Sequence, residues 1–322
     1  MSSVNRRSAS SFSLRIFADC AQVIQRVRLG GLAKFTSSIE SIKINAISLE
    51  NRGNQLMWIK RRQLGSGLIA VFANLFFLLA RARIHLLINL KKWQSWEVNC
   101  FRLLYGPTLP VLPEGRRTVC IGIIPGKSLR EWVMESTFAL PAIRAAAEEL
   151  RRAHGLWCGE FEDYWSHGDP HLENLIYDLE SNQARLIDFE LIHDPSLPAI
   201  RRHADDLLVF LQDLMSCVSA EEWVPLSLAF IEAYQRPSVI NEMRQRLTIP
   251  RGWSAIWWKL RTDYMARSVM VERINALNTA LSSNPEIEWR AREGVQGAQE
   301  YGQIPNLNPL SEENTKPRMY TN

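Results

Sequence analysis

Hydrophobic residues near the start of the chain recur at helical spacing. Between Phe12 and Arg28 they fall three or four positions apart, with arginines on the rest of the turn, which predicts an amphipathic helix. We expect this helix to pack against the rest of the protein; binding to a membrane surface is the alternative. Residues 1–11 are rich in serine, so residues 1–29 form a predicted N-terminal extension.

The pattern then changes to the alternation that is typical of strands. Residues 42–50 alternate between apolar and polar, residues 51–54 signal a turn, and residues 55–61 predict the returning strand of a hairpin. Side chains two apart on a strand share a face, so Trp58 and Lys60 are expected to point the same way.

A cluster of reactive polar residues lies between short apolar segments near the middle of the chain. His167-x-Asp169 is followed five residues later by Asn174, then by the apolar residues 175–177, a polar turn and a second apolar strand that ends on Asp188. A hairpin would bring Asp169, Asn174 and Asp188 to one edge. Phosphoryl transfer from Mg-ATP needs such a set: one carboxylate to accept a proton, and an amide and a carboxylate to hold the metal. The alternative is a surface loop with ordinary turn residues.

This spacing resembles the catalytic loop and metal-binding segment of the protein-kinase-like superfamily. Its His-Gly-Asp-x-His form is similar to the aminoglycoside and choline kinase branch rather than to protein kinases. The resemblance implies five roles around the phosphate: a base at Asp169, Mg²⁺ ligands at Asn174 and Asp188, a phosphate neighbour at His171 and a loop brace at His167. Asp-Phe-Glu at 188–190 replaces Asp-Phe-Gly, which speaks against a flipping activation segment but not against a metal on Asp188.

The same resemblance implies three supporting residues. Lys60 matches the strand Lys that holds the α and β phosphates, and Glu97, on a helix predicted over 93–105, is the candidate carboxylate that pairs with it. Asp206, on a helix that opens at Arg201, matches an Asp that steadies the catalytic loop. The alternatives are a solvated Lys, an ordinary exposed helix Glu, and an Asp favoured by the helix dipole.

An uncharged segment follows the first hairpin. Residues 63–80 contain no charged side chain, a length that alone reaches the threshold for a membrane span. Polar residues and two glycines interrupt the segment, and a span would place Lys60 and Asp169 on opposite sides of a bilayer. We therefore expect a buried or interfacial helix. The aromatic-x-Lys-Arg, the Gly-x-Gly and this apolar segment resemble, over about 44–105, the bacterial lipopolysaccharide core sugar kinases, which act at the cytoplasmic face of the inner membrane.

Charge is concentrated in this same region. The 322-residue chain has a net charge of +4, whereas nine Lys or Arg and two Glu between Glu50 and Tyr105 give nine minus two, or +7. Basic residues beside an apolar helix suit an anionic bilayer, so we expect possible peripheral membrane contact. A helix packed on the sheet with its cations in water is the alternative.

The remaining composition indicates a globular protein. Apolar residues make up 46% and charged residues 22%, and the five cysteines are scattered without metal-ligand spacing. The first residues lack the apolar core of a signal peptide. We therefore expect reduced thiols in a cytoplasmic protein. Trp and Tyr residues between 253 and 264 predict core packing, and residues 303–322 predict a disordered tail.

We predict an α+β, two-lobed protein-kinase-like fold. Residues 30–124 would form an antiparallel β lobe with the extra apolar helix, and residues 125–302 a mainly helical lobe that carries the catalytic loop. The predicted function is transfer of the γ-phosphate of ATP, with Mg²⁺, to a hydroxyl of a sugar, glycolipid or other small molecule. We expect no nucleic-acid partner.

Two other functions compete. A protein Ser/Thr kinase is disfavoured because no Gly-x-Gly-x-x-Gly precedes Lys60, and because sixteen steps from Glu190 to Asp206 leave little room for a peptide-docking loop. A pseudokinase acting as a binding or scaffold protein is favoured by Trp58 and by the missing glycine loop. Its difficulty is the presence of Asp169, Asn174 and Asp188 together.

Overall fold

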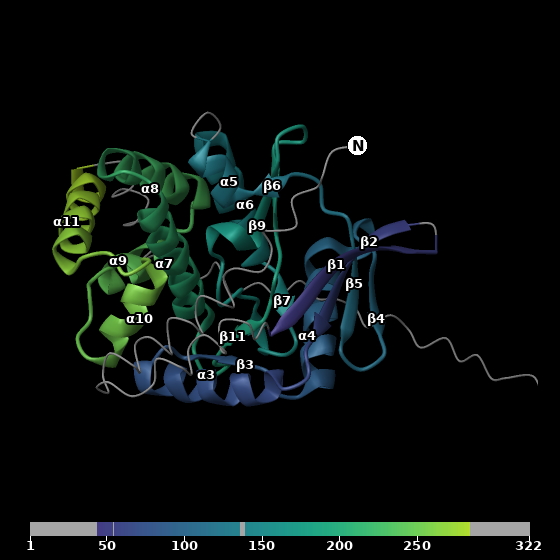
Figure 1. Cartoon of the computed structure of the whole chain (residues 1–322). Helices are drawn as coiled ribbons and strands as arrows, with labels where there is room; N and C mark the ends of the chain where they lie inside the picture. The colour runs from purple at the N-terminus through teal and green to yellow at the C-terminus, as the bar shows by residue number, and fades with distance from the viewer. Residues whose placement is uncertain (1–43, 54, 136–138, 284–322) are drawn as a thin grey trace, which may run out of the picture.

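The computed structural model describes residues 44–53, 55–135 and 139–283, and combines a small antiparallel sheet with a mostly helical remainder (Figure 1). The predicted helix over 12–28 and the predicted tail over 303–322 lie outside the described residues. The sheet occupies one end of the molecule, the helices α7 to α11 the other, and the helix α3 runs along one side beneath both (Figure 1).

The small sheet has the strand order β1-β2-β5-β4, and all three pairings are antiparallel. The hairpin prediction is confirmed, because β1 pairs with β2 from Asn45↔Arg62 to Arg52↔Gln55. One face of β2 is buried at Met57 and Ile59, whereas Trp58 is exposed. The four strands are β1 (Asn45–Arg52), β2 (Gln55–Arg62), β4 (Val111–Glu114) and β5 (Thr118–Gly122).

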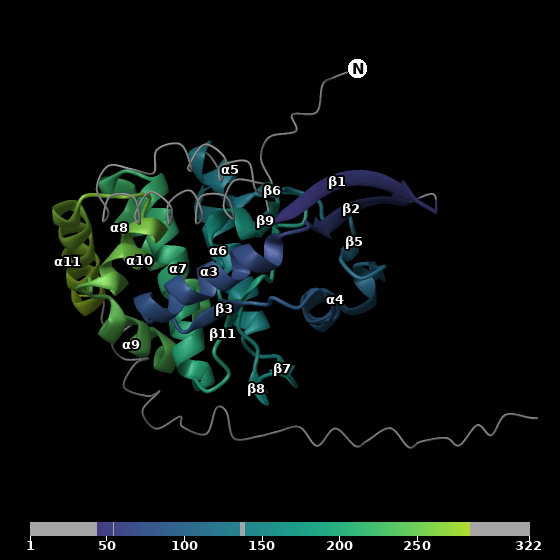
Figure 2. The ribbon, with the colours of Figure 1, turned by 60° about the horizontal axis from the view of Figure 1, so that its bottom comes forward.

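Between β2 and β4 the chain adds two α-helices, one short strand and the 3₁₀-helix η1 (Gly106–Thr108). The helix α3 (Ser66–Ala80) is followed by β3 (Ile84–Leu86) and by α4 (Leu90–Tyr105). The Asn89 side chain accepts hydrogen bonds from the backbone N–H groups of Lys91 and Lys92, which caps the start of α4. The helix α4 packs against β4 and β5, and Figure 2 shows it beside the small sheet, viewed nearly along its axis.

The middle of the chain folds into short strands, two α-helices and one 3₁₀-helix. The predicted hairpin after Asn174 is confirmed, but its second strand ends at Leu186 and not at Asp188, because the backbone of Asp188 turns into the left-handed region with φ 64°. The elements here are β6 (Lys127–Ser128), α5 (Leu129–Met134), α6 (Ala139–Ala153), β7 (Trp157–Cys158), β8 (Asp163–Tyr164), η2 (Leu172–Asn174), β9 (Leu175–Asp178), β10 (Gln183–Leu186) and β11 (Leu191–His193).

The C-terminal part is helical, as expected. Its longest helix, α7, is almost entirely buried between its neighbours and lies at the centre of this part of the core. Trp257 and Trp258 are buried as the aromatic pattern predicted, while Trp253 is exposed. The helices are α7 (Ala199–Cys217), α8 (Ala220–Tyr234), α9 (Pro237–Arg246), α10 (Trp253–Arg261) and α11 (Arg267–Ser283).

The helix α3 contacts both the strand β3 and the helix α10. Phe77 contacts Trp257 of α10 with ring centroids 5.3 Å apart, and the Ser254 hydroxyl donates a hydrogen bond to the carbonyl of Ala80. The expectation of a buried or interfacial helix is met, since one side of α3 is buried. Within the described part of the chain, no helix is both long enough and apolar enough to cross a bilayer.

Candidate active site

Lys60 lies at the centre of the candidate active site. It sits on β2 and is only 4% exposed. Its Nζ lies 2.8 Å from Oε1 of Glu97 on α4, 2.7 Å from Oδ1 of Asp188 and 3.1 Å from Oε1 of Glu190. Three segments far apart in the sequence thus meet on one ammonium group.

Arg62 supports this cluster from behind. It lies two residues after Lys60 on β2 and is 1% exposed; its guanidinium sits 5.2 Å from the ring centroid of Trp93 and 4.0 Å from Oε2 of Glu190. Its Nη2 also donates a hydrogen bond to the carbonyl of Leu87. Around Lys60, three carboxylates therefore face two cations, and the local charge is negative.

Burial and charge act in opposite directions on these groups. Burial disfavours the charged form of Lys60, but Asp188, Glu190 and Glu97 outweigh it and hold the pKa of Lys60 above its ordinary value. Burial raises the pKa of Glu97 to about 7, against the opposing pull of Lys60. Burial also raises the pKa of Glu190. An uncompensated negative charge is therefore costly here, and an added cation would relieve it.

The loop from His167 to Asn174 carries the predicted base. Asp169 is 5% exposed, and its Oδ1 has no hydrogen-bond partner among the described residues. The His171 ring lies 3.9 Å from Oδ2 of Asp169. Burial raises the pKa of Asp169 well above its ordinary value; Arg261 opposes the rise and Asp188 adds to it. This carboxylate is therefore a better proton acceptor than an exposed one.

Asp206 anchors the backbone of this loop. Its Oδ2 accepts a hydrogen bond from the backbone N–H of His167 and its Oδ1 one from that of Gly168, both at 2.8 Å. The His154 ring lies 2.9 Å from the same Oδ2. The other side of the loop is held by the His167 ring, whose Nε2 lies 3.0 Å from the carbonyl of Ile187.

Gly168 allows the close approach of this loop to β11. Its φ is +89°, and a Cβ at this position would lie 2.3 Å from the carbonyl oxygen of Leu191. Any larger residue would push the loop away from the strand that follows Glu190. The close packing of the loop against β11 therefore explains why a glycine stands between His167 and Asp169.

A second aspartate on α7 holds the far end of the loop. Asp213 lies seven residues after Asp206, which is two helical turns, so both face the loop. Its Oδ2 accepts a hydrogen bond from the backbone N–H of Leu172 at 2.8 Å, and Arg130 bridges it to Glu173 at distances of 2.6 and 3.2 Å.

The segment Asp188-Phe-Glu190 alternates between the site and the core. Phe189 is fully buried against Phe101, with ring centroids 4.8 Å apart, and its carbonyl accepts a hydrogen bond from Trp96 Nε1 at 2.7 Å. Its two neighbours therefore point together toward Lys60. The left-handed backbone at Asp188 is the kind of local strain that clusters at functional sites.

The residues present suit a magnesium ion with few protein ligands. Nδ2 of Asn174 donates to the carbonyl of Asp169 at 2.9 Å, so the amide oxygen is the atom left to ligate a metal. The Asp188 side chain is 31% exposed, the most accessible carboxylate around Lys60. In the described ranges, no group of three or more His, Cys, Asp or Glu is placed to hold a metal. Mg²⁺ typically takes only one or two protein carboxylates and completes its shell with phosphates and water.

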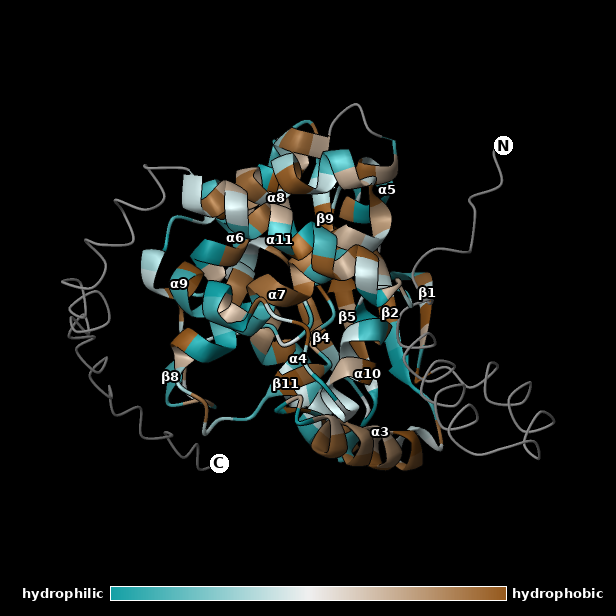
Figure 3. Cartoon of the chain, turned by 90° about the vertical axis from the view of Figure 1, so that its left-hand side faces the viewer, coloured by the Kyte–Doolittle hydropathy of each residue, from teal (hydrophilic) through white to brown (hydrophobic). Residues whose placement is uncertain are grey.

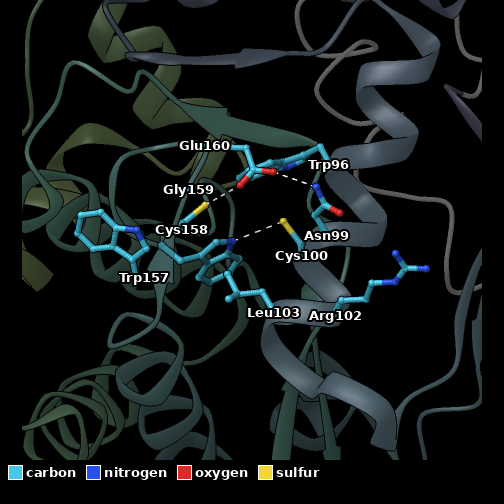
Figure 4. Close-up of a pocket in the computed structure, with 10 residues that line it drawn as sticks. Trp96, Asn99, Cys100, Arg102, Leu103, Trp157, Cys158, Gly159 and Glu160 are labelled. Carbon is cyan, nitrogen blue, oxygen red and sulfur yellow. Dashed lines mark hydrogen bonds between the residues drawn. The ribbon is translucent and has the colours of Figure 1, made fainter. Parts of the chain in front are cut away.

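A separate cavity of about 210 Å³ lies between α4 and the segment from Trp157 to Trp165 (Figure 4). Trp96, Cys100 and Leu103 of α4 face Cys158 and Trp165 across it, and Trp165 Nε1 donates a hydrogen bond to Cys100 Sγ at 3.5 Å. Glu97 is not among the residues that line it. We assign this cavity no part in the site around Lys60.

The structure brings the predicted residues together, and it adds several that sequence reasoning missed. Lys60, Glu97 and Asp188 are in contact, and His171, Asn174, His167 and Asp206 contact Asp169 or its loop. Missed were Glu190, Arg62, Asp213 and Arg130. Signals existed for two of them: Glu190 lies two residues after Asp188, and Asp213 lies seven residues, or two helical turns, after Asp206.

Comparison with known proteins adds little to this picture. No family model and no curated protein matches this sequence. The structure is similar to that of Plasmodium vivax ethanolamine kinase, with a TM-score of 0.34 and 10% sequence identity over 80% of this chain and 87% of that chain. A similarity of this size does not identify the reaction that this protein performs.

Proposed function

We propose that this protein is an ATP- and Mg²⁺-dependent phosphotransferase of protein-kinase-like fold that moves the γ-phosphate to a hydroxyl of a small molecule, sugar or glycolipid. The observation that carries the proposal is the position of Lys60, held within 2.8 Å of both Glu97 and Asp188 although 37 and 128 residues separate it from them. An ordinary solvated lysine has no reason to be buried in this way.

Each residue of the site has a role in this proposal. Lys60, oriented by Glu97 and Glu190, would bind the phosphates of the nucleotide. Asn174 and Asp188 would hold Mg²⁺, which when bound offsets the charge of the phosphates. Asp169 would accept the proton of the attacking hydroxyl, and its raised pKa suits that task. Asp206 and His167 would keep the Asp169 loop in place.

The chain after Glu190 favours a small acceptor over a protein substrate. The strand β11 begins at Leu191 and pairs with β3 from Leu191↔Leu86 to His193↔Ile84, and α7 begins at Ala199. Only residues 194–198 separate these two elements. A peptide-docking activation segment has no room there, so a protein Ser/Thr kinase is the weaker candidate.

The acceptor class remains open within this proposal. Sugars, lipid-linked sugars at an anionic membrane surface and other small alcohols all present the hydroxyl that Asp169 requires. A catalytically weak pseudokinase is the second candidate. Trp58 lies on the strand of Lys60, is 38% exposed and is not part of the sheet core, so its ring could block the nucleotide. Nucleotide binding without turnover would favour it.

The proposal is tested by ATP turnover with purified protein. The protein is incubated with Mg-ATP and panels of sugars, glycolipids, amino alcohols and peptides, and transfer of the γ-phosphate is measured. Transfer to one class that is lost in Asp169→Asn supports the proposal. Absence of both Mg-dependent ATP binding and transfer would exclude it, and binding without any transfer would leave the pseudokinase.

A further inference from the structure

The helix α3 is apolar on nearly all sides, but the described residues cover only one side of it. Its inner face contacts β3, β11 and α10, where Phe76 and Phe77 both stack edge-on against Trp257. The buried residues of this face are Ser66, Ala70, Ala73, Phe76, Phe77 and Ala80. A helix that is hydrophobic all round is ordinarily buried all round.

The outer face of α3 is an unbroken stripe of exposed apolar side chains. Leu64, just before the helix, is 82% exposed, and Phe72 and Leu78 on it are 61% and 74% exposed. The positions follow the helical repeat of three and four residues, so they lie on one side of the helix. Figure 3 shows most of α3 in brown, the hydrophobic end of the scale. We define the outer face as Leu68, Val71, Phe72, Leu75, Leu78 and Leu79.

Scattered exposed apolar residues are normal, but this concentration is not. Elsewhere in the described chain, exposed residues such as Leu112, Met134 and Leu179 occur one at a time, and the residues grouped on β1 and β2 (Ile47, Leu49, Leu56 and Trp58) are 38–46% exposed, less than Phe72 or Leu78. Six large apolar side chains on four turns of one helix form a contiguous patch, and such patches mark contact with a protein, a ligand or a membrane.

Cations stand at both ends of this face. Arg81 and Arg83 follow the C-terminal end of α3, and Lys91 and Lys92 open α4. The start of α4 lies beside the N-terminal end of α3, since a Cβ added at Gly67 would lie 3.7 Å from the Ile88 side chain. Arg83 is paired with Asp194 at 3.0 Å, whereas no salt bridge joins Arg81, Lys91 or Lys92 to a described carboxylate. No Asp or Glu occurs from residue 51 to residue 96.

The chemistry of the outer face favours lipid over other occupants. A second copy packed on it would bring the cationic ends of two helices together or leave them unmatched. A protein partner usually offers and requires hydrogen bonds across the interface. The outer face offers none, because all its side chains are hydrocarbon. Lipid tails satisfy such a face, and anionic headgroups satisfy the cations beside it.

We propose that the outer face of α3, with Arg81, Lys91 and Lys92, docks this protein on the surface of an anionic membrane. The helix would lie in the plane of the interface with its outer face in the acyl boundary. It would not span the bilayer. This docking requires no chemistry at Lys60 or Asp169, so it stands apart from the proposed phosphoryl transfer.

Docking through α3 would also fix the orientation of the candidate active site. The Asn74 side chain accepts a hydrogen bond from the backbone N–H of Leu86 and donates one to its carbonyl, so α3 is bonded to β3. In turn β3 pairs with β11, which directly follows Glu190. Through these contacts, the segment that carries Asp188 would keep a fixed orientation relative to α3, and therefore relative to the membrane surface.

The test is co-sedimentation of the full chain with vesicles. We expect binding to vesicles of phosphatidylcholine with phosphatidylglycerol, little binding to phosphatidylcholine alone, and release at ~1 M salt, where the Debye length falls to about 3 Å. Leu78→Glu should weaken binding at least about tenfold, because it removes a leucine that the membrane would bury and adds a charge of the same sign as the lipid headgroups. Each of Arg81→Gln and Lys91→Gln should weaken it about fivefold.

Matched controls separate docking from general effects of charge. Met134→Glu changes an apolar residue of α5 that is 69% exposed, close to the 74% of Leu78, and should bind as the unchanged protein does. Arg144→Gln on α6 removes a cation that lies away from α3. The proposal is overturned if the protein does not sediment with anionic vesicles at low salt, or if Met134→Glu weakens binding as much as Leu78→Glu. ATP turnover, measured without vesicles, reports separately on the proposed function.

Discussion

Glu97 lies 2.8 Å from Lys60, and neither side chain is more than 5% exposed. The pair joins β2 to α4 in the interior, with Asp188 and Glu190 on the same ammonium group. Removing one partner of a buried pair leaves a charge that nothing offsets, and this is ordinarily more damaging than losing a surface ion pair.

Lys60→Met is therefore expected to lower the free energy of unfolding by roughly 3–5 kcal/mol, because three carboxylates would face one another. Urea unfolding measures the change. Adding Glu97→Gln should restore part of the loss, since it removes one of the unpaired charges. The control is Arg61→Met, at the exposed position next to Lys60, and it should change stability by less than ~0.5 kcal/mol. Equal losses for Lys60→Met and Arg61→Met would contradict the buried cluster.

Asp169→Asn is expected to reduce phosphoryl transfer by about a hundred-fold or more, because the amide accepts no proton. Nucleotide binding, followed by calorimetry, should be largely retained, because the Lys60 cluster does not include Asp169. Transfer at an unchanged rate would remove Asp169 from the mechanism.

The same substitution should stabilise the metal-free protein at neutral pH. Asp169 has a raised pKa because it is buried, so between its ordinary and raised pKa values the folded state keeps a proton that the unfolded state releases. Stability then falls as pH rises through that window, and the loss persists above it. The melting temperature of Asp169→Asn, measured with a chelator, should exceed that of the unchanged protein at pH 7 and approach it toward pH 4. A lower melting temperature at pH 7 would count against a buried, unpartnered carboxylate.

Asp188→Ala is expected to abolish the dependence of ATP binding on Mg²⁺, because it removes the more accessible metal ligand. Calorimetric titrations with and without Mg²⁺ measure this. Glu190→Gln, which keeps the shape of another Lys60 partner, should lower affinity but preserve the Mg²⁺ effect. Metal-dependent binding that survives in both Asp188→Ala and Asn174→Ala would indicate a different metal site.

Gly168→Ala is expected to destabilise the protein by more than ~2 kcal/mol, because a left-handed residue acquires a Cβ against the carbonyl of Leu191. Gly115→Ala is a matched control: its φ is +57°, and nothing lies within 4 Å of the added Cβ. It should lose only the conformational part, about 1 kcal/mol. Thermal unfolding compares the two variants, and equal losses would mean that the loop can move away from β11.

The sequence by itself determined the features that depend on short spacing. The hairpin 45–62 and the hairpin after Asn174 follow from alternation, turn residues and short separations along the chain. Over such distances local geometry leaves few alternatives. Glu97 could be named as a candidate partner of Lys60, but their contact depends on how α4 packs.

Only the tertiary structure decided which distant groups share the site and which faces remain open. In the sequence, Glu190 is notable only because it replaces the glycine of Asp-Phe-Gly. In the structure, Phe189 is buried and the Glu190 carboxylate lies against Lys60. Arg130 joins the loop through Glu173 and through Asp213, which lies 83 residues away from it. The helix α3 is the clearest case, because the sequence of an apolar helix does not tell whether protein covers one side of it or both. Its burial is decided by β3, β11 and α10, which cover the inner face and leave the outer face exposed.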